Sequence, residues 1–221
     1  MPFSSFFLGK PQKNLPPDEV SITSPSSIGG NKSEQYLKIN PQGKVPALVC
    51  ESNGLCLAES DTISRYLLST YQSVGPSFQP DNPRSNQIAR FHDLYLTSIQ
   101  ACLYKPTPPF GIFGDRIDAL KEFSKQLYVI ADLMEDGTKY ACGDEVSLAD
   151  ATLFPTIVFA VFMFPKFDGV DFGGHDDSSQ VPAIPTKISN WFQSLIQNDP
   201  DFRKVYDEVS TISHYASYIS S

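Results

Sequence analysis

The sequence predicts a two-part fold, with a small α/β domain followed by an all-helical domain, and three observations carry this prediction. Residues 1–72 mix short strand-like runs with short helical patterns. After Asn86, by contrast, apolar side chains recur only at helical spacing. Residues 72–83 between them are rich in proline and glycine, as a linker would be. We therefore expect an α/β domain over residues 1–72 and an all-α helical bundle over residues 83–221.

The first domain is expected to hold strands and short helices in alternation. In chain order we expect a strand (19–23), a short helix (32–39), a hairpin (47–50 with 55–58) and an amphipathic helix after Ser60. The hairpin follows from Ser52, Asn53 and Gly54, which are typical turn residues between two apolar runs. The last helix follows from apolar residues such as Ile63 and Tyr66, which recur at helical spacing.

The second domain is expected to begin with two long amphipathic helices. The apolar stripe of the first comprises Ile88, Phe91, Leu94, Tyr95 and Ile99. The stripe of the second comprises Ile117, Leu120, Phe123, Leu127, Ile130 and Met134. Gly137 follows in a position to end that helix, since glycine adopts the left-handed conformation at helix ends without strain.

Three further helices complete the expected bundle. Ser147 and Asp150 have the spacing of a reciprocal N-terminal cap, so a helix should begin between them. Its apolar run, residues 151–164, is interrupted by Pro155 and is shorter than the roughly 20 residues that span a bilayer. We expect a buried core helix there. Two later helices are predicted around the apolar residues of 191–196 and over residues 202–209.

Composition excludes several classes of partner. A net charge of −8 argues against a nucleic-acid partner and against an anionic membrane surface. The N-terminus lacks a basic segment followed by an apolar core, so we expect no secretory signal and a cytoplasmic protein. The four cysteines form no C-x-x-C pair, which predicts buried free thiols. The three histidines are widely separated and the acidic run 168–179 lacks EF-hand spacing, so no metal site is expected.

The segment from Asn40 to Val49 carries the strongest functional signal. Pro46 directly precedes a short strand, and X-Pro bonds are the ones in which a cis peptide is inexpensive. A cis Val45–Pro46 bond would turn the Val45 N–H and C=O outward, where an extended peptide could pair with them. Glu59 and Ser60 at the start of the next helix offer a carboxylate, a hydroxyl and free amides. Together these groups predict a site for a small zwitterionic peptide.

Residues 13–212 resemble the cytosolic glutathione transferases. The matching motifs are Asn40-Pro41-x-Gly43-Lys44-Val45-Pro46-Ala47-Leu48, Glu59-Ser60-x-x-Ile63-x-x-Tyr66-Leu67 and Gly143-x-x-x-Ser147-Leu148-Ala149-Asp150. The resemblance implies a thioredoxin-like domain followed by an all-helical domain, in a homodimer. It also implies a glutathione transferase that uses glutathione as co-substrate, without a metal, and conjugates its thiolate to apolar electrophiles.

The resemblance implies binding roles for four residues. Lys44 would face the glycyl carboxylate of glutathione, and Val45 would pair its backbone with the cysteinyl unit. Glu59 and Ser60 would hold the γ-glutamyl amine and carboxylate. The side chains also have simpler explanations: Lys44 as a solvated lysine in a turn, Glu59 as a charge favoured at a helix start, and Ser60 as an N-cap. For the electrophile, the candidates are Tyr95, Tyr104, Phe110 and Phe113, with the tail around residues 214–218.

The catalytic residue is unknown from this sequence. The family places a Ser, Tyr or Cys after a first strand, where it stabilises the glutathione thiolate. Met1-Pro2-Phe3-Ser4 aligns with that position, but methionine cannot donate such a hydrogen bond. We therefore expect a truncated N-terminus without the first strand. Ser4 and Ser5 carry the nearby hydroxyls that could substitute for the catalytic group, with exposed helix N-caps as the simpler explanation. Two alternatives stay open: a catalytically impaired binding or assembly module, and a Cys-type thiol transferase or dehydroascorbate reductase.

Overall fold

The computed structural model describes residues 21, 23–71, 82–167 and 183–210, with no side-chain description at 209 and 210. The chain divides into two compact units, unit 1 (Met1–Gln79) and unit 2 (Pro80–Ser221). The Ser4 and Ser5 candidates, residues 72–81 of the linker, residues 168–179 of the acidic loop and the C-terminal tail fall outside the described residues, so the expectation of a missing first strand is not tested.

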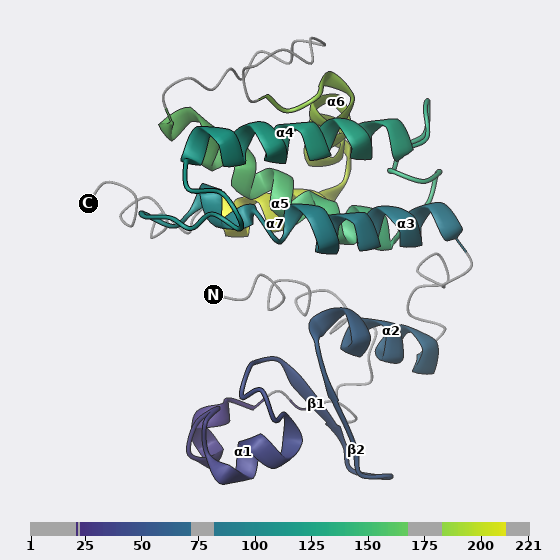
Figure 1. Ribbon diagram of the computed structural model, residues 1–221. Helices are drawn as coiled ribbons and strands as arrows, with labels where there is room; N and C mark the ends of the chain where they lie inside the picture. Colours follow the sequence, from purple (N-terminus) through teal and green to yellow (C-terminus); the bar gives the residue numbers. More distant parts are fainter. Residues whose placement is uncertain (1–20, 22, 72–81, 168–182, 211–221) are drawn as a thin grey trace. The chain divides into compact units, whose positions relative to one another are not determined.

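Unit 1 contains a hairpin between helices (Figure 1). In chain order its elements are η3 (Pro25–Ile28), α1 (Glu34–Ile39), β1 (Ala47–Cys50), β2 (Leu55–Ala58) and α2 (Ser60–Thr70). The hairpin and the start of α2 are confirmed as predicted. Helix α1 begins two residues later than expected, because the Ser33 side chain caps it by accepting the Tyr36 N–H. The strand predicted over 19–23 lies mostly outside the described residues, and Ser21 and Thr23 belong to no element.

The hairpin is antiparallel, with Ala47 opposite Ala58 and Cys50 opposite Leu55. This register decides where the functional segments lie. The chain enters β1 from Pro46 and leaves β2 into Glu59, at the same end of the hairpin. Residues 44–46 and 59–60 are therefore brought together although they are far apart in the sequence.

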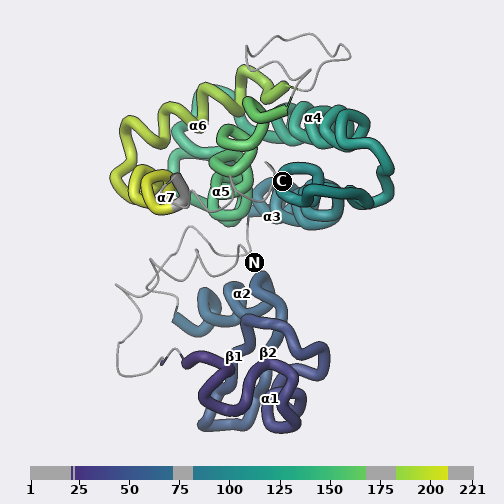
Figure 2. Tube along the Cα trace, turned by 90° about the vertical axis from the view of Figure 1, so that its left-hand side faces the viewer, coloured from purple at the N-terminus to yellow at the C-terminus, as the bar shows by residue number. Residues whose placement is uncertain are grey.

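Unit 2 is a helical bundle arranged around α5 (Figure 2). Its elements are α3 (Pro83–Phe91), η6 (His92–Leu96), η7 (Gln100–Leu103), α4 (Arg116–Leu133), α5 (Leu148–Met163), η8 (Phe164–Lys166), α6 (Thr186–Asn198) and α7 (Pro200–Ser210). Helix α5 runs through the middle, with α6 and α7 on one side and α3 and α4 on the other. Leu153, Phe154 and Ile157 in α5 are almost completely buried.

One predicted apolar stripe is partly wrong. Residues 88–99 do not form one regular α-helix, because α3 passes into a π-helical turn, η6. A π-turn contains an extra residue, which rotates the following side chains around the axis. As a result Leu96 is buried, whereas Leu94 and Tyr95 are 46% and 48% exposed. The spacing of apolar residues in the sequence could not reveal this extra residue, because it was interpreted with the period of a regular α-helix.

The end of α4 also differs from the prediction. The helix stops at Leu133, and Met134 is its C-cap with an extended backbone. Gly137 has a positive φ of 73°. It therefore lies in the following turn and does not cap the helix. The stripe itself is confirmed, since Leu120, Phe123 and Leu127 have no exposed surface.

Helix α5 is the core helix that its composition predicted. The segment Leu148–Lys166 is long and apolar enough to cross a membrane by length and hydropathy, but 78% of its most apolar window is buried inside the protein. Its first turn carries the expected capping box of Ser147 and Asp150. The Asp150 carboxylate accepts the Ser147 N–H at 2.9 Å, the Ala141 N–H at 2.7 Å and the Trp191 indole at 3.2 Å.

Candidate functional site

The Val45–Pro46 peptide is cis, as the sequence predicted. The Val45 side chain is 38% exposed. Among the described residues, neither its backbone N–H nor its C=O has a hydrogen-bond partner. An unpaired amide and carbonyl on one exposed residue are the groups that an added extended peptide would use. Lys44, next to it, is also exposed.

The turn before Val45 is held by a network of side chains. The Lys44 carbonyl accepts the Tyr36 hydroxyl at 2.7 Å and the Asn40 side-chain amide at 2.8 Å. The Asn31 amide donates to the Gly43 carbonyl at 2.8 Å. Tyr36 and Asn40 are 5% and 3% exposed, so these bonds are shielded from water. The sequence analysis did not identify Tyr36 or Asn31, since nothing in their spacing marks side chains that reach back to a later turn.

Gly43 makes this turn possible. Its φ is +61°, and a Cβ there would meet the Asn31 carbonyl oxygen at 2.7 Å. An L-residue at this position would be strained by its backbone and would also displace a neighbouring chain segment. The close approach of two backbones at Gly43 therefore explains why the motif carries glycine.

Ser60 and Glu59 lie at the N-terminus of α2. Ser60 is the first helical residue and Glu59 is the N-cap, yet the Glu59 side chain makes no capping hydrogen bond. The first amides of the helix consequently lack an intrahelical acceptor, and a helix N-terminus favours a carboxylate or another anion. Glu59 itself is exposed and has φ +68° and ψ +121°. Among the described residues it is the only non-glycine residue with a positive φ.

These groups together form one end of unit 1 at which a zwitterion could be bound. The hairpin register brings the segments around Val45 and Ser60 to the same end. Lys44 supplies a cation, Glu59 supplies an anion, Val45 supplies a backbone pair and α2 supplies free amides. The complement of this set is a short peptide with a carboxylate at each end and a free amine.

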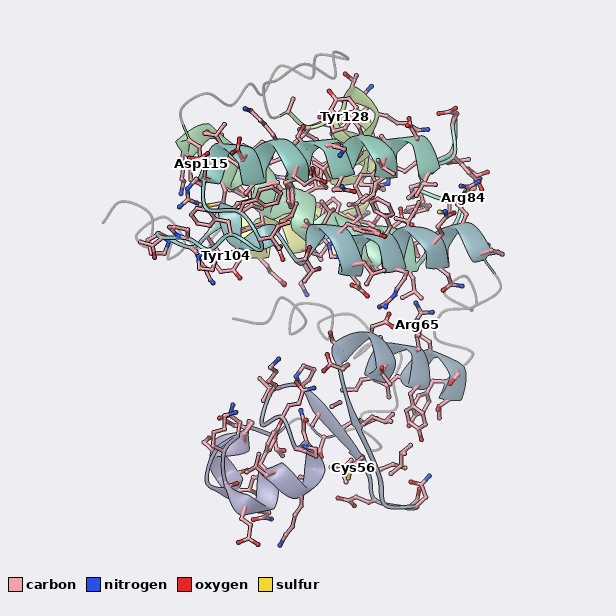
Figure 3. All side chains as sticks on the ribbon, in the orientation of Figure 1. Cys56, Arg65, Arg84, Tyr104, Asp115 and Tyr128 are labelled. Carbon is pink, nitrogen blue, oxygen red and sulfur yellow. The ribbon has the colours of Figure 1, made fainter. Side chains whose placement is uncertain are left out.

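The electrophile candidates of unit 2 differ in exposure. Tyr95 and Tyr104 are 48% and 38% exposed, Phe113 is half-buried and Phe110 is only 3% exposed. Phe110 lies 4.5 Å beneath the Arg116 guanidinium, which also donates to the Cys102 and Lys105 carbonyls. Phe110 therefore anchors the loop between η7 and α4. Tyr104 and Asp115, at the two ends of this loop, lie at the same end of unit 2 (Figure 3).

All four cysteines are free, but the expectation that they are buried is wrong for two of them. Cys102 and Cys142 are buried, and burial raises the pKa of each thiol to about 12. Cys56 is exposed on β2 and Cys50 is half-buried at the end of β1. Hydrogen bonds from Ser52 and Tyr66 hold the pKa of the Cys50 thiol below its ordinary value. Strands of a two-stranded hairpin have one covered face at most, which explains the exposure.

The side chains that could bind a metal are dispersed over the described part of the chain. No group of three or more His, Cys, Asp or Glu side chains gathers there in a geometry that could hold an ion. His92, which the sequence leaves without a role, is buried and contacts the Thr156 hydroxyl at 2.7 Å.

The sequence matches two family descriptions. Residues 12–77 match "Glutathione S-transferase, N-terminal domain", and residues 87–194 match "Glutathione S-transferase, C-terminal domain". The first range contains the Lys44, Val45, Glu59 and Ser60 segments. The second contains most of the helical bundle, including all of α4 and α5.

Individual proteins support the same family. Glutathione S-transferase hmp2 of Hypomyces subiculosus is 38% identical over 197 residues, covering 83% of this chain and 84% of that protein. Glutathione S-transferase 3 of Zea mays is 30% identical over 149 residues, or 61% of this chain and 64% of the maize protein. The match thus spans less than two thirds of the maize relative.

A solved structure shows the same fold. The crystal structure of a diazinon-metabolizing glutathione S-transferase from the silkworm Bombyx mori superposes with a TM-score of 0.63 at 23% identity, covering 92% of this chain and 91% of that chain. At this identity the comparison shows a shared fold. The chain belongs to the glutathione S-transferase family, with a thioredoxin-like N-terminal domain followed by an all-helical domain.

Proposed function

We propose that this protein binds glutathione at the Val45–Ser60 end of unit 1 and conjugates its thiolate to small apolar electrophiles. The observation that carries the proposal is the Val45 backbone, which has no hydrogen-bond partner among the described residues, beside the N-terminus of α2, where Glu59 makes no side-chain cap. In the reaction, the thiolate sulfur forms a bond to an electrophilic carbon, and the leaving group departs with the electron pair of the broken bond. The proposal assigns no side chain to activation of the thiol.

Each predicted site residue has one role in this proposal. The Lys44 ammonium pairs with the glycyl carboxylate, and the Val45 backbone pairs with the cysteinyl unit. The Ser60 hydroxyl and the first amides of α2 bind the γ-glutamyl carboxylate, while the Glu59 carboxylate binds its amine. Charge-assisted hydrogen bonds of this kind are stronger than neutral ones, so the two ends of the tripeptide supply most of the affinity.

The proposal extends to the setting in which the protein works. Membership in the family and the chain's acidic composition support a cytoplasmic homodimer that needs no metal. One chain has a mass of 24.5 kDa, and light scattering of the purified protein should give twice this mass. A mass of one chain at micromolar concentration would contradict the dimer but would leave glutathione binding untouched.

Calorimetric titration with glutathione, followed by a conjugation assay with a chlorinated dinitrobenzene, tests the function. Ser60→Ala should raise the KM for glutathione roughly tenfold to a hundredfold, because it removes a hydrogen bond to a charged group. Ser69→Ala is the matched control, since Ser69 is exposed on the same helix and its hydroxyl donates to the Tyr66 carbonyl.

Three outcomes are informative. Conjugation that weakens in Ser60→Ala but not in Ser69→Ala supports the proposal. Binding without conjugation would favour the impaired binding module over the enzyme. A folded protein that neither binds glutathione nor conjugates it would remove the proposal altogether.

A further inference from the structure

We propose that Tyr36 and Asn40 are positioning residues of the glutathione site, because together they aim the Val45 amide at the ligand. This inference rests on the proposed function. Neither side chain is assigned a contact with glutathione. Both act through the backbone of Lys44, on which their hydrogen bonds converge.

Two donors occupy the Lys44 carbonyl. The Tyr36 hydroxyl lies 2.7 Å from this oxygen, and the Asn40 amide nitrogen lies 2.8 Å from it. A carbonyl oxygen has two lone pairs, so its hydrogen-bonding capacity is filled from inside the protein. The donors are 5% and 3% exposed, which means that water does not compete strongly for these bonds.

The geometry of the peptide group transmits this constraint to Val45. The Lys44 C=O and the Val45 N–H belong to the same peptide unit, which is planar and trans. In a trans peptide these two groups point in opposite directions. Holding the carbonyl toward Tyr36 and Asn40 therefore directs the Val45 N–H away from them. That amide has no partner among the described residues, as a group kept for a ligand would.

The two donors are themselves fixed. The Tyr36 N–H donates to the Ser33 side chain at 3.1 Å, within the first turn of α1. The Asn40 N–H donates to the Tyr36 carbonyl at the other end of this helix. The Asn40 side-chain oxygen accepts the Gln42 N–H at 3.1 Å, which leaves its nitrogen for Lys44. Helix α1 thus acts as a short, rigid support for the turn.

The test compares Tyr36→Phe with a control that removes a similar hydroxyl elsewhere. Tyr36→Phe keeps the ring and loses only the bond to Lys44. The control is Tyr140→Phe in unit 2, where a buried hydroxyl donates to the Asp199 carboxylate, also at 2.7 Å. Asn40→Asp is the second variant, because it keeps the acceptor for Gln42 and loses the donor for Lys44.

We expect Tyr36→Phe to weaken glutathione binding by about fivefold to tenfold in calorimetry, the size of one hydrogen bond. Asn40→Asp should weaken it at least as much, because its carboxylate would also repel the Lys44 carbonyl oxygen. In the conjugation assay the KM for glutathione should rise, while the KM for the electrophile stays unchanged. Tyr140→Phe should lower the unfolding midpoint without changing either KM. The Val45 amide resonance of the free protein should shift in Tyr36→Phe and not in Tyr140→Phe.

The outcomes separate this inference from the function on which it rests. If the wild-type protein binds glutathione and folded Tyr36→Phe binds it equally well, the positioning role is wrong and the proposed function stands. If the Val45 resonance does not move in Tyr36→Phe, the coupling through the Lys44 peptide is wrong. If wild-type protein fails to bind glutathione, the proposed function fails, and this inference fails with it.

Discussion

At the scale of single residues, Glu59 combines a strained backbone with a functional position. Its φ of +68° lies where a side chain meets the following carbonyl. Strain of this kind persists only where surrounding structure enforces it, and it clusters at binding sites. Here the hairpin register delivers the chain from β2 into α2 within one residue, and Glu59 is that residue. The strained residue is thus the N-cap of α2, at the position that the proposed function assigns to binding.

Replacing Glu59 by glycine or alanine separates backbone strain from side-chain loss. Both variants lose the carboxylate, but only glycine adopts a positive φ freely. We expect Glu59→Gly to be more stable than Glu59→Ala by roughly 0.5–1 kcal/mol in urea unfolding. At Glu51, an exposed turn residue without a positive φ, the order should reverse. The same order at both positions would argue against strain at Glu59.

At the scale of elements, the junction of α6 and α7 depends on one carboxylate. Asp199 accepts the Asp201 and Phe202 N–H groups through Oδ1 and the Tyr140 hydroxyl through Oδ2, with Lys139 at 3.3 Å. Burial raises the pKa of Asp199, but the hydrogen bonds from Tyr140, the Phe202 N–H and Lys139 outweigh it and bring this pKa below its ordinary value. The carboxylate thereby joins the 139–140 segment to the start of α7.

This junction predicts an acid-dependent stability. A carboxyl whose pKa is lower in the folded state stabilises the protein above its unfolded-state value, near 3.8 here, and that contribution is lost as pH falls through the folded value. Asp199→Asn keeps the Oδ1 cap but loses the charge. It should cost about 1–2 kcal/mol at pH 7 and less near pH 3, in urea unfolding.

Asp207→Asn is the control for this experiment. It removes the same charge from α7, but its partner Arg203 is 56% exposed, and exposed pairs contribute little. The stability difference between this variant and wild type should hardly change over the same pH range. If Asp199→Asn lowers the free energy of unfolding equally at pH 3 and pH 7, the stabilising role of the charged Asp199 carboxylate is contradicted.

At the scale of the whole molecule, buried apolar surface is distributed unequally. Among the described residues, Tyr36 and Ile63 are the buried hydrophobic side chains of unit 1. Unit 2 has an extended core that includes Phe123, Phe154 and Phe192, each almost fully buried. Burial of apolar surface is the main favourable term in folding. Among the described residues, unit 2 therefore contributes most of the free energy of folding.

Two fragments test this distribution. Residues 80–221 alone should unfold in one cooperative urea transition, followed by circular dichroism. Residues 1–79 alone should show no cooperative transition, since the described part of this unit combines a single two-stranded hairpin with two buried hydrophobic side chains, Tyr36 and Ile63. The intact chain provides the reference. A cooperative transition in the smaller fragment, or none in the larger one, would contradict this account.

The sequence by itself determined the elements whose signals are local. The hairpin follows from Ser52, Asn53 and Gly54, the start of α5 from Ser147 and Asp150, and the α4 stripe from its spacing, because each depends on neighbours within a few positions. The two binding motifs were equally visible as patterns, although the roles of Lys44, Val45, Glu59 and Ser60 stay proposals.

Only the tertiary structure decided how those local pieces act together. The π-turn at His92–Leu96, which exposes Tyr95, depends on packing against α4 and α5 and leaves no mark in residue spacing. The convergence of Tyr36 and Asn40 on the Lys44 carbonyl is likewise invisible in a linear pattern. The physical reason is the same in both cases. Hydrogen bonds and packing between elements form only once the chain has folded, whereas helix propensity and hydrophobic periodicity depend on neighbours along the sequence.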